Sequence, residues 1–326
     1  MAAVSKPPVA VLGAGSIGVS FAILFACHGF DVTVYDPFDD ALPRAEADLR
    51  DRLRQFTGTD DAALLVRFTS DLDVAVADAG FVQECAPERI ELKRELLQQA
   101  AVRTGADVPL ASSSSAIVAS RIADGLDAAV AARIVVGHPG NPPYLLPVVE
   151  VVPSAATSDA ITERATEVYR AAGLRPVLVR REVEGFLFNR LQGALLREAY
   201  CLVRDGVASV DDVDEVVRSG LGRRWAVIGP FETADLNTRG GIESHAEKMG
   251  PAYERMGAER GQHDPWTPDL VAEVTAQRRA LLDLDDWEKR VRWRDGQLIR
   301  MRDADHRGDG QTRVRPPSSA STEPVA

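Results

Sequence analysis

A histidine and a glutamate stand out because each interrupts an apolar run with the character of a buried strand. His138 follows residues 134–137, and Glu150 lies inside residues 148–152. A carboxylate in such a run is costly without a partner. When it bonds one ring nitrogen of a histidine, it fixes the tautomer and strengthens the other nitrogen as a base. Such a pair suits removal of a hydroxyl proton while hydride leaves the same carbon for a nicotinamide; alternatively, His138 is a structural residue at a strand end.

Hydroxyl and amide side chains occur at two further positions of interest. The serines at residues 112–115 come directly after an apolar run at residues 108–111, and Asn189 lies in the stretch GFLFNRL at residues 185–191. Such groups can bond a substrate oxygen. A serine run is also typical of loops and helix N-caps, and Asn189 also suits the start of a helix. Spacing alone leaves both interpretations open.

The N-terminal region has the glycine spacing of a dinucleotide-binding turn. Gly13, Gly15 and Gly18 form a GxGxxG between an apolar run and a helical pattern. The first glycine permits the tight turn, the second lets backbone approach a diphosphate, and the third packs helix on strand. Ser16 and Ile17 begin the helix, whose N-terminal N–H groups favour negative charge. The turn therefore predicts a site for a dinucleotide diphosphate.

An acidic residue at the end of the second apolar run supports this prediction. Asp36 comes directly after residues 31–35. A carboxylate there accepts hydrogen bonds from ribose hydroxyls and repels a 2′-phosphate, so NAD is favoured over NADP. The same fingerprint is compatible with FAD. The alternative is that Asp36 only starts a turn and the glycines only pack.

These side chains need elements that bring them to one edge of a sheet. Apolar runs alternate with helical patterns, which predicts an α/β domain with a Rossmann-type, doubly wound and mainly parallel sheet. Sites on such sheets lie at the carboxyl ends of the strands. The expected strands are residues 9–12, 31–35, 79–84, 108–112, 134–138, 148–152 and 177–180, with helices at residues 42–56, 89–103, 117–126 and 159–172 among others.

The pattern changes near residue 185. From residue 186 onward only helical spacing recurs, beginning with a long helix that stops at Gly206. We expect residues 1–184 to form an NAD-binding Rossmann domain and residues 185–302 to form an all-helical C-terminal domain. Residues 303–326 are rich in Asp, Gly, Ser and Pro, so we expect a disordered tail there.

Composition narrows the class of partner. The chain has 326 residues and a formal net charge of −11. That charge disfavours nucleic acid and membrane surfaces as partners, and no apolar run reaches the ~18 residues of a membrane span. No secretory signal is visible. The cysteines, at positions 27, 85 and 201, are far apart, which predicts a reducing compartment and no metal site. We expect a cytoplasmic protein.

Taken together, these motifs resemble the L-3-hydroxyacyl-CoA dehydrogenase family. The resemblance covers about residues 8–300, and the sequence is most similar to the λ-crystallin/L-gulonate 3-dehydrogenase branch of the family. It rests on the glycine turn with Asp36, on ASSSS at 111–115, on HPGNPPY at 138–144 leading to Glu150, on GFLFNRL at 185–191, and on GLGRRW at 220–225 with GPFE at 229–232.

The resemblance implies roles for individual residues. His138 would be the general base and Glu150 its orienting partner. Ser115 and Asn189 would hydrogen-bond the substrate oxygen and hold the reacting carbon over the nicotinamide. These roles agree with the acid–base pair inferred from the residues themselves.

The resemblance also implies contacts outside the base. Glu88 and Lys93 match positions on the nicotinamide side of NAD, although the residues alone suggest a solvated turn and helix start. The family further implies a homodimer built through the helical domain, which would also contribute to substrate binding.

Substrate choice depends on a few departures from the family pattern. Pro139 and Gly140 stand where acyl-CoA members usually carry aromatic residues. Arg224 matches an arginine of the gulonate-like branch and could grip a free carboxylate, or it could lie at a helix end or subunit interface. The first expectation is an NAD-dependent oxidoreductase acting on an L-3-hydroxy acid such as L-gulonate. The alternatives are a short-chain L-3-hydroxyacyl-CoA dehydrogenase and a non-catalytic, crystallin-like NAD-binding protein.

Overall fold

The computed structural model describes residues 6–226, 229–237 and 241–261 continuously, together with scattered residues between 269 and 300. The expected tail at 303–326 lies outside the described residues. The chain divides into two compact units, one holding the described residues up to Phe186 and the other beginning at Leu187. The expected domain boundaries at residues 184 and 302 stay predictions.

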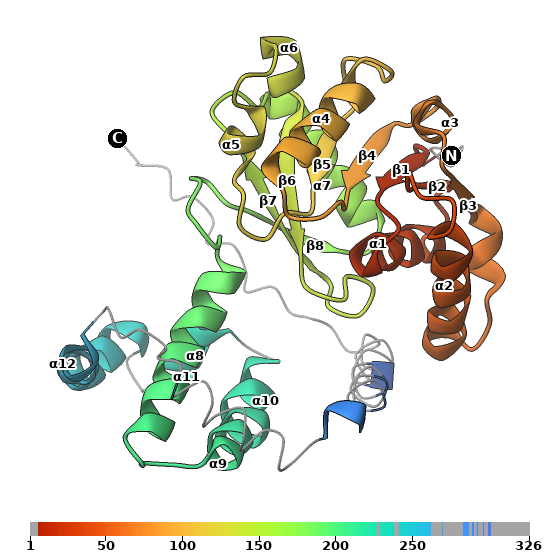
Figure 1. The fold of residues 1–326 in the computed structure, drawn as a ribbon. Helices are drawn as coiled ribbons and strands as arrows, with labels where there is room; N and C mark the ends of the chain where they lie inside the picture. Colours follow the sequence, from red (N-terminus) through yellow and green to blue (C-terminus); the bar gives the residue numbers. More distant parts are fainter. Residues whose placement is uncertain are drawn as a thin grey trace, which may run out of the picture. The chain divides into compact units, whose positions relative to one another are not determined.

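The first unit is built on a single eight-stranded sheet (Figure 1). Its order is β3-β2-β1-β4-β5-β6-β7-β8, and every neighbouring pair is parallel except β6 and β7. The predicted Rossmann-type sheet is confirmed. The strands are β1 (Val9–Leu12), β2 (Val32–Tyr35), β3 (Val66–Thr69), β4 (Phe81–Glu84), β5 (Leu110–Ser112), β6 (Ile134–Pro139), β7 (Val148–Pro153) and β8 (Arg175–Leu178).

Helices cover both faces of this sheet (Figure 1). Successive side chains of a strand point to opposite faces, so Val9 and Val11 join one apolar core while Ala10 and Leu12 join the other. The first core holds α1 (Ser16–Cys27), α2 (Leu42–Thr57) and α7 (Asp159–Ala171), and the second holds α3 (Leu72–Val76), α4 (Ile90–Ala101) and α5 (Ala119–Ala123). The 3₁₀ helix η1 (Asp61–Leu65) and α6 (Ala128–Ala131) complete the unit.

The regular elements in the described residues of the second unit are all helices, as the sequence predicts. The long helix α8 ends at Arg204, just before the left-handed Gly206 (φ 68°). The elements are α8 (Phe188–Arg204), α9 (Val210–Glu215), the π-helix η2 (Val216–Leu221), α10 (Gly222–Trp225), α11 (Pro230–Asn237), α12 (Gly241–Arg260) and the 3₁₀ helix η3 (Leu284–Asp286).

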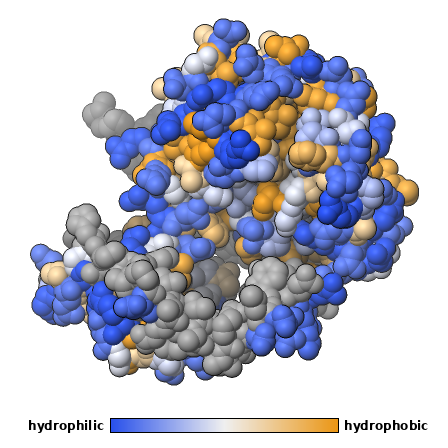
Figure 2. Space-filling view, in the orientation of Figure 1, coloured by the Kyte–Doolittle hydropathy of each residue, from blue (hydrophilic) through white to orange (hydrophobic). Residues whose placement is uncertain are grey.

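The visible surface is mainly hydrophilic. Hydrophilic side chains cover most of the face shown in Figure 2, with apolar side chains exposed between them. Within the described ranges, none of the helices is long and apolar enough to cross a membrane.

Candidate active site

The antiparallel pairing of β6 with β7 places His138 directly opposite Glu150. The Nδ1 atom of His138 lies 2.7 Å from Oε2 of Glu150. Both residues are buried, with 5% and 3% of their surface exposed. The pairing inferred from the two interrupted strands is therefore present as a close, water-shielded hydrogen bond.

The residue before the histidine is fixed by close packing. A Cβ atom at Gly137 would lie 1.8 Å from the hydroxyl oxygen of Tyr169. Tyr169 is fully buried on α7, and its hydroxyl donates to Oε1 of Gln83 at 2.7 Å. Only glycine leaves room for this hydroxyl, so α7 and β4 together fix the depth of β6 at the residue next to His138.

The glycine turn shows a separate reason for each glycine. Gly13 is left-handed (φ 114°), and a Cβ there would lie 2.9 Å from the Cys85 carbonyl oxygen. A Cβ at Gly18 would lie 1.8 Å from the Gly13 carbonyl oxygen. At Gly15, by contrast, a Cβ would meet nothing within 4 Å. The outer glycines are needed for packing, whereas Gly15 faces open space at the start of α1, which is the place where a diphosphate approaches in this type of turn.

Asp36 is tied to the same turn. Its Oδ2 accepts a hydrogen bond from the backbone N–H of Ala14 at 3.0 Å, and its Oδ1 accepts one from Phe38 at 3.2 Å. A cleft runs from this carboxylate past Gly15 to the apolar side chain of Leu96 on α4. The cleft thus combines N–H donors at a helix start, a carboxylate for ribose hydroxyls and an apolar wall. These residues fit NAD.

The sequence reasoning missed Glu84, which ends β4 and is fully buried. Lys93, itself 1% exposed, donates from Nζ to both Glu84 oxygens at 3.0 and 3.2 Å and to the Ala86 carbonyl at 2.9 Å. Ser112 and the N–H of Ala86 also donate to this carboxylate. Burial raises the pKa of the Glu84 carboxyl, while Lys93 and Ser112 oppose the rise. The signal available in the sequence was a carboxylate at the end of a buried strand, the same signal that marks Glu150.

Glu88 links this buried pair to the serine run. Its Oε1 accepts from the Ser114 hydroxyl and from the backbone N–H groups of Ser115 and Ala116, both at 3.1 Å. Its Oε2 lies 3.3 Å from Nζ of Lys93. Burial alone would raise the pKa of Glu88, but the bond from Ser114 and the charge of Lys93 lower it below its ordinary value. Glu88 therefore holds the loop that carries Ser115.

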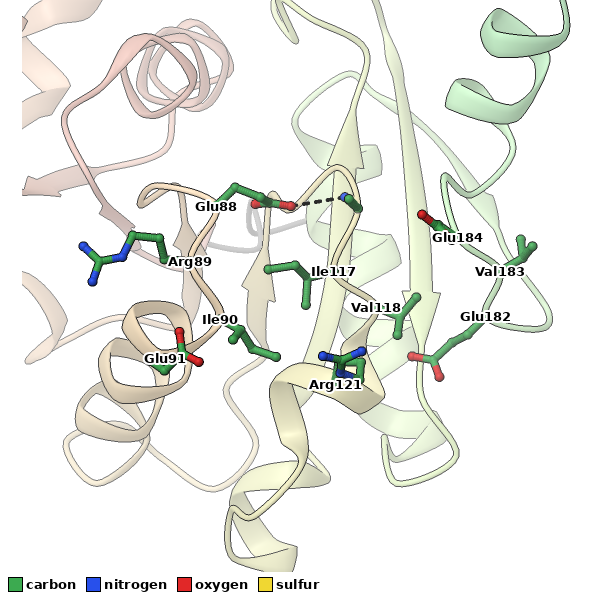
Figure 3. A pocket seen from close by; sticks show the side chains of 11 residues that line it. Glu88, Arg89, Ile90, Glu91, Ile117, Val118, Arg121, Glu182, Val183 and Glu184 are labelled. Atoms are coloured by element: carbon green, nitrogen blue, oxygen red, sulfur yellow. Dashed lines mark hydrogen bonds between the residues drawn. The ribbon is translucent and has the colours of Figure 1, made fainter. Parts of the chain in front are cut away.

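A hollow opens beside Glu88 (Figure 3). On its far side Glu182 accepts a hydrogen bond from the N–H of Ser120, at the start of α5, at 2.7 Å. The hollow is lined by residues 88–91, 116–118, 121 and 182–184, and its charged members are Glu88, Arg89, Glu91, Arg121, Glu182 and Glu184. It therefore lies between the loop held by Glu88 and the segment that leads out of the first unit.

The predicted site residues fall into three groups. His138 meets Glu150, and Glu88, Lys93 and Ser115 gather around the ends of β4 and β5; the glycine turn and Asp36 form the third group. Asn189, in the first turn of α8, and Arg224, on α10, belong to the second unit, so their proposed roles stay predictions.

The doubly wound sheet, the glycine turn and Asp36 define a dinucleotide-binding protein. The comparisons with known proteins place it more closely. Residues 8–183 match the model of the NAD-binding domain of 3-hydroxyacyl-CoA dehydrogenase, and residues 185–281 match that of its C-terminal domain. The chain belongs to the 3-hydroxyacyl-CoA dehydrogenase family and is an NAD-dependent dehydrogenase.

Individual relatives cover most of the chain. It is 38% identical to a lambda-crystallin homolog of Bos taurus, over 91% of this chain and 95% of that protein. It is 41% identical to an L-carnitine dehydrogenase of Streptomyces griseus, over 84% of this chain and 79% of that protein. Among solved structures, an NAD⁺-dependent 5-formyl-3-hydroxy-2-methylpyridine 4-carboxylic acid 5-dehydrogenase matches 91% of this chain and 97% of its own with a TM-score of 0.77 and 28% identity.

The glycine turn predicts opposite results for two alanine substitutions. Gly15→Ala should leave the free energy of unfolding unchanged but weaken NAD binding about tenfold or more, because its methyl group enters the space the diphosphate needs. Gly18→Ala should cost about 1–3 kcal/mol of stability, because its methyl group collides with the Gly13 carbonyl. Urea denaturation and NAD titration calorimetry measure the two quantities. Unchanged NAD affinity in Gly15→Ala would remove this glycine from the cofactor site.

The buried ion pair predicts a large cost for removing one partner. Lys93→Met should lower the free energy of unfolding by about 3–5 kcal/mol, since it leaves the Glu84 carboxylate buried without its cation. The double variant Glu84→Gln/Lys93→Met should recover part of that loss. The control is Arg103→Met, which breaks an exposed pair with Asp73 and should cost under about 1 kcal/mol. Equal losses for the two single variants in urea denaturation would contradict a special role of the buried pair.

Proposed function

We propose that this enzyme oxidises the 3-hydroxyl group of a small L-3-hydroxy acid, such as L-gulonate, with His138 removing the hydroxyl proton. The observation that carries the proposal is the 2.7 Å bond between His138, near the carboxyl end of β6, and Glu150 on β7. The same sheet carries the cofactor turn after β1. NAD, when bound, supplies the acceptor for the hydride. The carbon thus loses a hydride and the oxygen loses a proton, which leaves a ketone.

The geometry of the pair suits general-base chemistry. Because Glu150 bonds Nδ1, the neutral imidazole carries its proton on that nitrogen and presents Nε2 as the basic atom. Nε2 takes the hydroxyl proton, and the nearby carboxylate stabilises the imidazolium that forms. In the reverse direction the same imidazolium returns the proton to the carbonyl oxygen.

Ser115 and Asn189 are proposed to hold the substrate oxygen. Support for Ser115 comes from its loop, which Glu88 fixes through backbone N–H groups at 3.1 Å. Support for Asn189 is its place in the first turn of α8 within the family motif. Both groups would act by orientation, placing the reacting carbon over the nicotinamide.

Arg224 is proposed to bind the substrate carboxylate. It is exposed on α10, and a guanidinium can hold a carboxylate through two parallel hydrogen bonds.

A second candidate substrate follows from the relatives named L-carnitine dehydrogenase. L-Carnitine is also a 3-hydroxy acid but carries a trimethylammonium group, for which the glutamates around the hollow beside Glu88 offer complementary charge. A hydroxyacyl-CoA thioester would lack the free carboxylate that Arg224 is proposed to bind.

The proposed setting is a homodimer in the cytoplasm. Exposed apolar side chains on α8, among them Leu191 at 67% exposure, support an association surface in the helical unit. The cysteines at positions 27, 85 and 201 form no disulfide with one another, which supports a reducing compartment.

The base assignment predicts a specific loss. His138→Gln should lower kcat by about 10²–10⁴-fold and leave NAD binding unchanged. Steady-state oxidation rates measure kcat, and titration calorimetry measures NAD binding. His28→Gln, a histidine whose ring bonds the Leu24 carbonyl away from the pair, is the matched control. Near-normal turnover in His138→Gln would remove it from the mechanism.

A substrate panel distinguishes the candidate functions. NADH formation is followed with L-gulonate, L-carnitine, 3-hydroxybutyrate and 3-hydroxybutyryl-CoA at fixed NAD. Arg224→Ala should raise KM for the free acid that is turned over about tenfold or more with little change in kcat, and Arg223→Ala on the same helix is the control. Exclusive turnover of the thioester would favour the acyl-CoA alternative. NAD binding with no turnover of any compound would favour the crystallin-like alternative.

A further inference from the structure

The segment that leaves the first unit has an unusual backbone. Gly185 and Phe186 are both left-handed, with φ of 76° and 49°, and Phe186 is the one residue other than glycine with positive φ among the described parts of the chain. A bulky side chain disfavours this conformation, which persists only where the surroundings impose it. Glycine would adopt the same turn without strain, so the benzyl group at residue 186 has a reason to be there.

Two sets of contacts hold Phe186 in place. Its side chain is fully buried in the apolar core that also contains Val136 of β6 and Val152 of β7. Its N–H donates to the Val183 carbonyl at 3.1 Å, closing a tight turn. The turn therefore drives the ring inward, toward the two strands that carry the acid–base pair.

The ring meets the imidazole itself. The centroids of the Phe186 and His138 rings are 5.5 Å apart, and their planes are inclined at 51°. The bond from Nδ1 to Glu150 positions one side of the imidazole. The Phe186 ring packs against the imidazole as well, so it limits the swings of the ring plane that the side-chain torsions χ1 and χ2 allow.

We propose that Phe186 is a positioning residue for His138, holding the plane of the imidazole so that Nε2 is directed at the substrate hydroxyl. This inference rests on the proposed role of His138 as the base. Glu150 sets which nitrogen is basic, and Phe186 sets where that nitrogen points. The strained turn at Gly185–Phe186 is the means by which the backbone places the ring.

The test compares two phenylalanines that are equally buried. Phe186→Leu keeps an apolar side chain but loses the ring face, and Phe30→Leu does the same at a position that packs on Phe25, away from the imidazole. With the substrate that the wild-type enzyme turns over best, Phe186→Leu should lower kcat at least tenfold while KM for NAD stays within twofold. Phe30→Leu should leave kcat within twofold even if the melting temperature falls equally. Equal kcat in the two variants would overturn the proposal.

A spectroscopic readout keeps the inference separable from the proposed function. In the wild-type protein the carbon-bound ring protons of His138 should show a ring-current shift by NMR, assigned with His138→Gln. Phe186→Leu should abolish that shift while the Nδ1-protonated tautomer remains. If the shift changes but the wild-type enzyme oxidises no hydroxy acid, the proposed function fails and the positioning contact stands. If the ring-current shift of the His138 protons is the same in Phe186→Leu as in the wild-type protein, the contact is refuted. If Phe186→Leu does not fold, Phe186→Met takes its place in both measurements.

Discussion

Burying a carboxylate in an apolar sheet is expensive, and the site is organised around two such groups. Glu84 and Glu150 are almost completely excluded from solvent, where an unpaired ionised group would cost far more than the stability of a typical domain. Each has a partner that brings further function. Lys93 satisfies Glu84 and reaches Glu88, which in turn fixes the serine loop; His138 satisfies Glu150. The need to compensate buried charge thus holds the serine loop and the His138 side chain in fixed positions.

The sequence predicts well what depends on local pattern. The glycine turn, Asp36 and the alternation of strand and helix each follow from rules that act over a few residues, and the sheet order and the helical second unit agree with them. The pairing of His138 with Glu150 was also accessible, because a charged residue inside an apolar strand demands a partner.

Features that depend on tertiary contacts were beyond reach. The strand β3 is short, lies at the sheet edge and is only partly buried, so its sequence lacks a strong strand pattern. Glu84 acquires meaning only because Lys93 on α4 folds back onto it. The close packing of Gly137 on Tyr169 joins residues far apart in the chain. The left-handed backbone of Phe186 could not be predicted either, because a glycine before a phenylalanine does not indicate that conformation. Only the family resemblance places Lys93 on the nicotinamide side of NAD, and that contact stays a prediction. The structure adds that its buried ammonium bonds protein oxygens, which the residues alone did not indicate.

The antiparallel pairing of β6 with β7 has a consequence for the evolution of the family. It puts the histidine and its carboxylate only twelve positions apart in the chain, on two adjacent strands of one unit. The proposed acid–base pair is therefore formed by two neighbouring strands of the first unit. A substrate contact made elsewhere in the chain could change by mutation without altering this hydrogen bond. That arrangement is compatible with one fold in relatives whose names give different substrates, 3-hydroxyacyl-CoA and L-carnitine.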